Sequence, residues 1–271
     1  MATRIITSLV GLPIIIGLLA LGGLPLKIGV LTVSIIGMYE FYKVISKQNL
    51  PLHYMNYFLA AIYIFFADSF NVSFLQMFYS LVILANVVSL VFFYKKYNII
   101  DCVVGAFAFF YVAMLLTNAI LVRNYENGEF LVWLIFISAW GCDTGAYFFG
   151  KMLGKHKLAP ILSPNKTIEG SIGGIVTAAL LGAVFAFALQ YFYETTSFFG
   201  YNIIILFSLI CACGSICSQL GDLTASAIKR FTKTKDYGNI FPGHGGVLDR
   251  FDSVLFTAPC VYAVILILSR A

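Results

Sequence analysis

"SIGGIVTAALLGAVFAFALQYFY", residues 171–193, contains no charged side chain over 23 consecutive positions. A helix rises 1.5 Å per residue, so a stretch of this length covers the roughly 30 Å hydrocarbon core of a bilayer. Backbone groups in lipid must form their hydrogen bonds internally, which favours a helix. The sequence therefore predicts a transmembrane helix at these residues.

Comparable apolar stretches recur along most of the chain. Of its 271 residues, 61% are apolar and 11% are charged, whereas soluble domains have about 45–50% apolar and about 25% charged residues. The predicted fold is an all-α polytopic membrane protein. We expect nine spans, at residues 5–23, 25–43, 53–71, 74–94, 102–122, 130–150, 171–193, 202–225 and 253–270.

Two of these spans have a second interpretation. The first resembles a secretory signal, but it lacks an A-x-A cleavage site, so we expect a retained anchor. The third contains His53, Asn56 and Asp68 and is also compatible with an interfacial segment.

The positions of the basic residues predict the orientation, because cytoplasmic connections retain Lys and Arg. With the N-terminus in the cytoplasm, 14 of the 17 basic residues fall in cytoplasmic segments. The exceptions are Lys27, Arg123 and Arg270. Nine spans then place the C-terminus outside. The net charge of +5 follows from this bias and does not indicate nucleic-acid binding.

The two parts of the chain differ in their polar residues. Residues 1–130 are predicted to be scaffold helices that offer a lipid or dimer surface, with Glu40, near Lys43, interpreted as an interfacial residue. Residues 131–271 are predicted to be the catalytic part, with basic, glycine-containing cytoplasmic loops at 151–170 and 226–252. No internal repeat suggests an inverted-repeat transporter.

Asp143, in "SAWGCDTGAYFFGK" (138–151), lies inside the sixth predicted span. A carboxylate at membrane depth costs a few kcal/mol. It is therefore either a hydrogen-bonded structural residue or a functional one, as a ligand of a cation or part of a polar cavity.

"SPNKTIEGSIGG", residues 163–174, predicts a helix start at Ser163 and Pro164. A helix N-terminus beside Lys166 would attract phosphate. The alternatives are a solvated pair of Lys166 and Glu169, and glycines that serve close helix packing.

Two further stretches carry polar side chains at helical spacing. In "GDLTASAIKR" (221–230), Asp222, Ser226 and Lys229 share one stripe of a helix. In "KDYGNIFPGHGGVLDRFDS" (235–253), Asp249 and Asp252 lie one turn apart. Neighbouring carboxylates require a cation between them, and Mg²⁺ prefers one or two carboxylates plus phosphate oxygens and water.

These stretches all fall at the cytoplasmic ends of predicted spans six to nine. Carboxylates, basic residues and glycine loops at that position predict metal-assisted phosphoryl or nucleotidyl transfer to a lipid. A transporter or channel is the rival, since intramembrane Asp and Lys also mark ion paths. The charges gather on one side of the bilayer, which favours the enzyme.

"SAIKRFTKTKDYGNIFPGHGGVLDRFD", residues 226–252, resembles the signature of the phosphatidate cytidylyltransferases, also called CDP-diacylglycerol synthases. "DTGAY", "SPNKTIEG" and the Gly-Asp pair at 221–222 are also similar to that family. The resemblance covers the C-terminal half. It implies that CTP and phosphatidate give CDP-diacylglycerol and pyrophosphate, at a site of the inner cell membrane that faces the cytoplasm.

The resemblance also implies cofactors, partners and residue roles. We expect Mg²⁺, with K⁺ as a candidate second cation, and a homodimer is compatible with the family. A CDP-archaeol synthase and a polyprenol kinase remain alternatives. The expected metal ligands are Asp143, Asp222, Asp249 and Asp252; phosphates are assigned to Lys166, Lys229, Arg230, Lys235 and Arg250; Glu169, Ser226, Asp236, His244, Gly245 and Gly246 complete the expected site.

Overall fold

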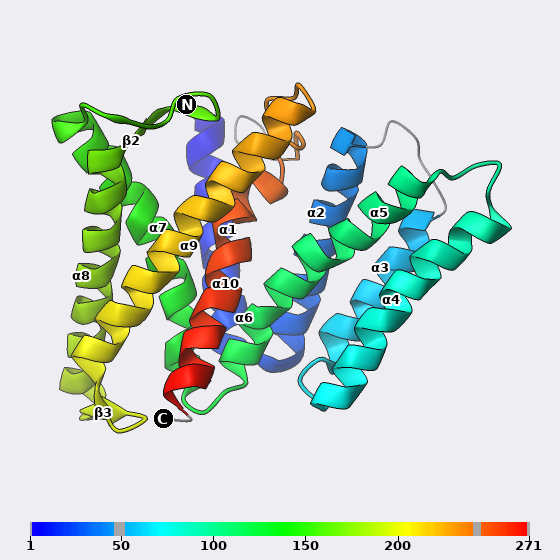
Figure 1. Cartoon of the computed structure of the whole chain (residues 1–271). Coiled ribbons are helices and arrows are strands. Elements are labelled where there is room, and N and C mark those ends of the chain that lie inside the picture. Colours follow the sequence, from blue (N-terminus) through cyan, green and yellow to red (C-terminus); the bar gives the residue numbers. More distant parts are fainter. Residues whose placement is uncertain (1, 46–51, 241–244, 270–271) are drawn as a thin grey trace. The chain divides into compact units, whose positions relative to one another are not determined.

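Figure 1 shows the computed structural model, which describes residues 2–45, 52–240 and 245–269, with side chains from residue 11 and, after the first gap, from residue 54. Its helices are α1 (Ala2–Leu21), α2 (Gly23–Ile45), α3 (Leu52–Phe66), α4 (Val72–Phe92), α5 (Ile99–Ala108), the π-helix η1 (Phe109–Met114), α6 (Leu115–Arg123), α7 (Gly128–Leu153), α8 (Ile168–Tyr193), α9 (Ile203–Phe231) and α10 (Leu248–Leu268). Helices therefore form almost all of the regular secondary structure of the described residues, as predicted.

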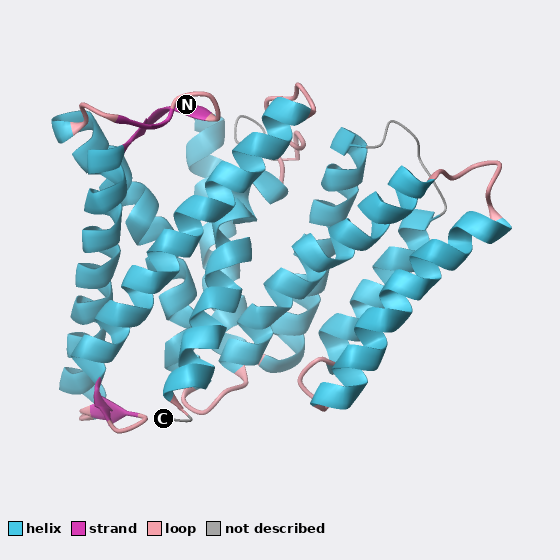
Figure 2. Cartoon of the chain, viewed as in Figure 1, coloured by secondary structure: helices cyan, strands magenta, loops and turns pink. Residues whose placement is uncertain are grey.

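Within the described residues, two short antiparallel hairpins interrupt this helical fold (Figure 2). One pairs β1 (Lys157–Ala159) with β2 (Ser163–Thr167), and the other pairs β3 (Ser197–Phe198) with β4 (Tyr201–Asn202). The sequence pattern did not predict these strands. Both hairpins lie in connections between long helices.

The chain is a helical, polytopic membrane protein. Within the described residues, seven helical segments are long and apolar enough to cross a membrane: α2, α4, the continuous α5–η1–α6, α7, α8, α9 and α10. Two shorter apolar helices, Gly11–Leu21 and Tyr54–Phe66, coincide with the first and third predicted spans. The count of nine spans stays a prediction.

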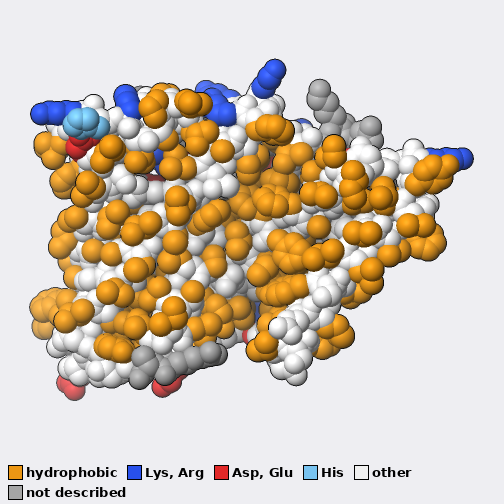
Figure 3. Space-filling model, in the orientation of Figure 1, with side chains coloured by type: hydrophobic (Ala, Val, Ile, Leu, Met, Phe, Trp, Pro, Cys, Tyr) orange, Lys and Arg blue, Asp and Glu red, His pale blue; other side chains and the backbone are white. Residues whose placement is uncertain are grey.

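The exposed side chains fit a lipid environment. Leu180, Val184 and Phe187 form a stripe on α8 and are 61%, 64% and 64% exposed. Figure 3 shows hydrophobic side chains spread over much of the visible face, with Lys and Arg mainly along its upper margin. An apolar surface of this kind is stable only against lipid or another apolar partner.

The chain divides into two compact units. The first comprises Met1–Asn124 and Phe231–Phe251, and the second comprises Tyr125–Arg230 and Asp252–Ala271. The segment after α9 and the first turn of α10 therefore belong with the N-terminal helices. The division predicted at residue 130 concerned function and stays a prediction.

Two basic residues that depart from the predicted charge bias cap helices in the first unit. Lys27 Nζ donates to the carbonyl of Phe65 at 2.8 Å, near the end of α3, and pairs with Asp68 at 2.8 Å. Arg123 donates to the carbonyls of Leu19 and Ala20 at 2.9 and 3.1 Å, at the end of α1. Basic side chains bind such unpaired terminal carbonyls favourably. Their positions thus have a structural cause.

A buried amide pair connects α3 to α4 in the same unit. Asn56 and Asn86 are 0% and 1% exposed, and each Nδ2 donates to the other's Oδ1 at 3.0 Å. Asn86 also donates to the carbonyl of Val82 at 2.8 Å. Polar side chains that bond across helices stabilise packing in lipid. The burial of Asn56 favours α3 as a packed helix over an interfacial segment.

In the second unit, small residues bring α7 and α8 together. A Cβ on Gly174 would lie 2.8 Å from the carbonyl oxygen of Cys142, and one on Gly170 would lie 2.8 Å from that of Ala146. A Cβ on Gly141 would lie 3.4 Å from Cα of Ala178. Such contacts exclude larger side chains, so the packing role that was an alternative for Gly170 and Gly174 is confirmed.

We predict that Asn86→Ala destabilises the first unit by about 1 kcal/mol, because it leaves the buried amide of Asn56 without one of its partners. Thermal unfolding in detergent would measure the loss. The double variant Asn56→Ala, Asn86→Ala should lose less stability than the two single variants lose together. Strict additivity would contradict the pairing.

Candidate functional site

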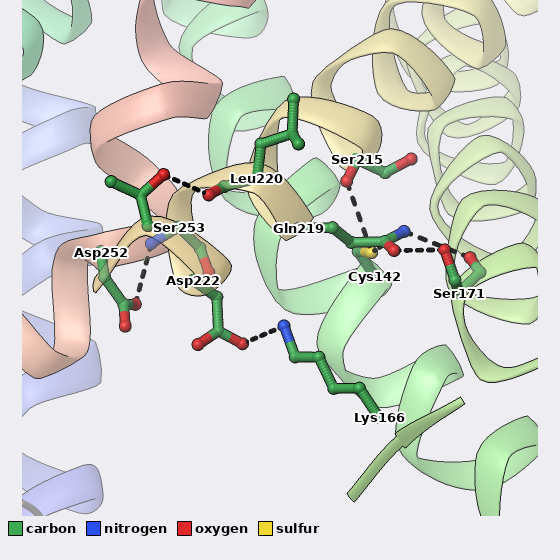
Figure 4. A network of polar contacts seen from close by, with 10 residues as sticks. Cys142, Lys166, Ser171, Ser215, Gln219, Leu220, Asp222, Asp252 and Ser253 are labelled. Carbon is green, nitrogen blue, oxygen red and sulfur yellow. Dashed lines mark hydrogen bonds and ion pairs between the residues drawn. The ribbon is translucent and has the colours of Figure 1, made fainter. Parts of the chain in front are cut away.

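Lys166 and Asp222 form an ion pair in the second unit (Figure 4). Lys166 comes from β2 and Asp222 from α9, and their side chains are 26% and 29% exposed. The sequence predicted a phosphate-binding lysine and a metal-binding carboxylate in two distant motifs. The structure places them in contact, where they neutralise each other.

Asp252 lies in the second turn of α10 and is 9% exposed. Its Oδ1 accepts a hydrogen bond from the backbone N–H of Ser253 at 2.8 Å. Asp222, Lys229 and Asp143 all act on this carboxylate electrostatically. Figure 4 shows the carboxylates of Asp222 and Asp252 pointing to the same side. A buried carboxylate near others of like charge is costly in its ionised form unless cations lie nearby.

The close approach of α9 and α10 depends on Gly221. A Cβ there would lie 3.1 Å from the ring of Phe256 and 3.3 Å from the carbonyl carbon of Asp252. The glycine next to Asp222 therefore has a packing reason. It lets the backbone that carries Asp222 pass directly against the backbone of Asp252.

A polar network adjoins this cluster inside the helices. Gln219 Nε2 donates to the carbonyl of Ser171 at 3.2 Å and to Cys142 Sγ at 3.3 Å, and Ser171 Oγ donates to Gln219 Oε1. The Cys142 thiol donates to the carbonyl of Ser215 at 3.6 Å. These groups join α7, α8 and α9 behind Asp222. The sequence interpretation missed Gln219, although a glutamine in an apolar span is itself a signal.

The start of α8 corrects one prediction. Ser163 and Pro164 do not begin a helix; they lie in β2, paired with β1. Thr167 is the N-cap, and its Oγ1 accepts from Gly170 N at 3.1 Å. The hydroxyl of Thr167 satisfies a first-turn amide there. Lys166 thus extends from a strand toward Asp222.

Glu169 holds the connection before β1. Its carboxylate accepts from the backbone N–H groups of Lys155 and His156 at 3.1 and 3.2 Å, and it contacts His156 Nδ1 at 2.6 Å. The carboxylate therefore fixes the loop that leads to Lys166. A contact between Glu169 and substrate stays a prediction.

The end of α9 requires a second correction. The helix continues to Phe231, so Ser226, Lys229 and Arg230 lie in its last turns and not in a loop. The continuity confirms the helical stripe of Asp222, Ser226 and Lys229. Arg230 is exposed, and its Nε donates to the carbonyl of Leu162 at 3.3 Å.

In the first unit, Asp249 binds two backbone N–H groups that precede α10 in the chain. Its Oδ2 accepts from Tyr237 N at 2.8 Å and from Gly246 N at 3.0 Å. Gly245 has φ +83°, a conformation that favours glycine, and a Cβ there would lie 2.9 Å from that oxygen and 3.4 Å from Asp236 Oδ1. Asp249 therefore has a structural role beyond the predicted metal binding.

The remaining predicted residues have simple placements. Lys235, Asp236 and Arg250 are exposed, and His244 lies outside the described residues. Among the residues that the structure describes, no three His, Cys, Asp or Glu side chains are arranged to hold a metal ion.

Relatives of the chain identify its family. The cytidylyltransferase family model matches residues 2–268. The chain belongs to this family. It is 34% identical over 280 residues to a phosphatidate cytidylyltransferase of Bacillus subtilis (strain 168), covering 99% of each chain. Its identity to a phosphatidate cytidylyltransferase of Staphylococcus haemolyticus (strain JCSC1435) is 33% over 269 residues, 96% of each chain.

A third relative matches a shorter region more closely. The phosphatidate cytidylyltransferase of Staphylococcus aureus (strain COL) is 46% identical over 134 residues, 49% of this chain and 48% of that protein. The resemblance inferred from the sequence motifs is confirmed by these matches.

In this member of the cytidylyltransferase family, we predict that Gly221→Ala separates α9 from α10. The backbone of Asp252 cannot move aside as a flexible side chain would. The unfolding midpoint in detergent should fall by several degrees, at roughly 2–4 °C for each kcal/mol lost. Gly17→Ala, which has nothing within 4 Å, should leave it unchanged or raise it slightly, because Ala is the better helix former. Equal midpoints for the two variants would contradict the close approach.

Proposed function

We propose that this chain transfers the cytidylyl group of CTP to phosphatidate, giving CDP-diacylglycerol and pyrophosphate. The family match over residues 2–268 and two nearly full-length relatives of that name support the reaction. The observation that carries the site is the pairing of Lys166 with Asp222 beside the buried Asp252.

The reaction joins two anions. A phosphate oxygen of phosphatidate attacks the α-phosphorus of CTP, a new P–O bond forms, and the bond to the β-phosphate breaks. The lipid phosphate has a second pKa of about 6 and is already largely dianionic near pH 7. No general base is needed, so the chain's task is to position the phosphates and offset their repulsion.

Lys166 and Lys229 are proposed to meet the phosphates. Lys166 now neutralises Asp222, and Lys229 acts electrostatically on Asp252. Both ammonium groups can exchange a carboxylate partner for a phosphate oxygen without leaving the cluster. The carboxylate that Lys166 releases would then need another cation, which Mg²⁺ could supply.

The carboxylates of Asp222 and Asp252 have the right chemistry for Mg²⁺. They are hard oxygen donors of like charge, and Mg²⁺ prefers one or two carboxylates together with phosphate oxygens. When bound, Mg²⁺ would supply charge neutralisation for the phosphates, and Asp222 and Asp252 would hold it. Asp143 acts electrostatically on Asp252 and is the third candidate. The second cation, K⁺, stays a prediction, and so does a homodimer.

We further propose nine spans, a cytoplasmic N-terminus and a site on the cytoplasmic side of the inner membrane. The distribution of 14 of 17 basic residues supports this orientation. The capping roles of Lys27 and Arg123 account for two of the three exceptions. The test is to introduce single cysteines into a variant without the six native cysteines. A membrane-impermeant thiol reagent should then label outer positions in intact cells and cytoplasmic positions only in inverted membrane vesicles.

Detergent-purified protein should convert radiolabelled CTP and phosphatidate into a CDP-lipid in the presence of Mg²⁺. Phosphorylated archaeol lipids and polyprenols, offered separately, test the two related activities. Product from polyprenol alone would replace the proposal with a kinase. No product from any acceptor would favour a transporter.

We predict that Asp252→Asn lowers turnover by about a hundredfold or more while leaving thermal stability equal or higher. The amide keeps the acceptor for Ser253 N, and the substitution removes a buried charge near like charges. Turnover and unfolding should be measured on the same preparation.

Asp101→Asn provides the opposite pattern. Asp101 completes a capping box with Asn98 at the start of α5; Asn keeps the acceptor but removes the negative charge at this helix N-terminus, so stability should fall slightly and turnover should stay unchanged. Wild-type turnover in Asp252→Asn would remove Asp252 from the site.

A further inference from the structure

Glu40 is a buried carboxylate in α2 that binds backbone N–H groups at the start of α10, within the first unit. It is 1% exposed. Its Oε1 accepts from Val247 N at 3.0 Å and its Oε2 accepts from Leu248 N at 2.8 Å. The residues are 207 and 208 positions apart. The sequence interpretation of Glu40 as an interfacial residue is therefore wrong.

Two glycines provide the space for this carboxylate. A Cβ on Gly246 would collide with both oxygens of Glu40, and a Cβ on Gly238 would collide with Oε1. Gly246 is itself buried. Glycine at these positions thus has a cause within the chain, independent of any bound substrate.

The Glu40 carboxylate supplies hydrogen-bond acceptors to the N-terminus of α10. The first N–H groups of a helix lack intrahelical partners, and a negative charge there is favourable. Leu248 is the first residue of α10, and Val247 precedes it. Because each oxygen of Glu40 takes one N–H, the carboxylate fixes both the position and the direction of the helix start.

Asp249, in the first turn of α10, binds a third backbone N–H group of this turn. It takes the N–H of Gly246, while Glu40 takes those of Val247 and Leu248. Three consecutive amides are therefore held by two carboxylates. Any movement of this turn would move Asp249 directly, and the same helix, α10, carries Asp252 one turn further on.

We infer that Glu40 is a positioning residue for the reaction, which sets the first turn of α10 and so the orientation of the carboxylates that this helix carries. The inference rests on the proposed function. Glu40 acts through the backbone and not on the substrates, because both of its oxygens are occupied by the N–H groups of Val247 and Leu248.

Glu40→Gln tests the inference with little change of shape. The amide nitrogen would face a backbone N–H, so one donor loses its acceptor. We expect turnover at saturating CTP and phosphatidate to fall about tenfold or more, with a smaller change in the KM for CTP. Hydrogen exchange of a peptide spanning 245–250 should speed up by about tenfold or more, since opening becomes easier.

Glu129→Gln is the matched control, because Glu129 is exposed in the first turn of α7. It should change neither turnover nor exchange. Unaltered exchange at 245–250 in Glu40→Gln would overturn the anchoring. Faster exchange with wild-type turnover would overturn the positioning role. A wild-type protein without CDP-lipid synthesis would instead refute the proposed function, and the exchange result would still report on the anchor.

Gly246→Ala leaves Glu40 itself unchanged and keeps the test open if Glu40→Gln fails to fold; wild-type turnover in this variant would contradict the inference. Gly246→Ala alone should reduce turnover, because the methyl group displaces the Glu40 carboxylate. In a Glu40→Ala background the same change should add almost nothing, since the space is then empty. Full additivity of the two losses would contradict the inference.

Discussion

The cost of a carboxylate inside an apolar helical protein constrains the rest of this structure. Each such group needs a compensating partner, because an unpaired buried charge is far more costly than a paired one. Asp222 has Lys166, and Glu40 has the amides at the start of α10. These requirements determine which distant segments come together.

Much of the fold and part of the site could be predicted from the sequence. Long uncharged stretches identify the membrane helices, since no other structure satisfies the backbone in lipid. Helical spacing placed Asp222, Ser226 and Lys229 on one stripe, and α9 confirms it. Both members of the Lys166 and Asp222 pair were identified as site residues. Their contact could not be predicted, because the two motifs are separated by a complete transmembrane helix.

The errors have local physical causes. Ser163 and Pro164 carry a helix-start signal, but pairing with β1 outweighs it and leaves Thr167 to cap α8. The loop predicted at 226–252 was too long at its start, since α9 continues to Phe231. Glu40 was misinterpreted because its partners are backbone N–H groups, which no residue type reveals. The cost argument applied to Asp143 held equally for Glu40 and would have predicted a partner for it.

The nature of the partner separates two kinds of carboxylate. Backbone amides are fixed by the fold, so Glu40 and Glu169, which bind them, hold a helix start and a loop. A lysine side chain is different, because it can exchange one anion for another while its backbone stays in place. Asp222 is compensated in this second way. A site that must admit phosphates and release pyrophosphate requires such replaceable compensation, while the helices that carry it require the fixed kind. Carboxylates bound by backbone amides thus hold the structure in place, while a carboxylate paired with a lysine leaves the site able to exchange anions.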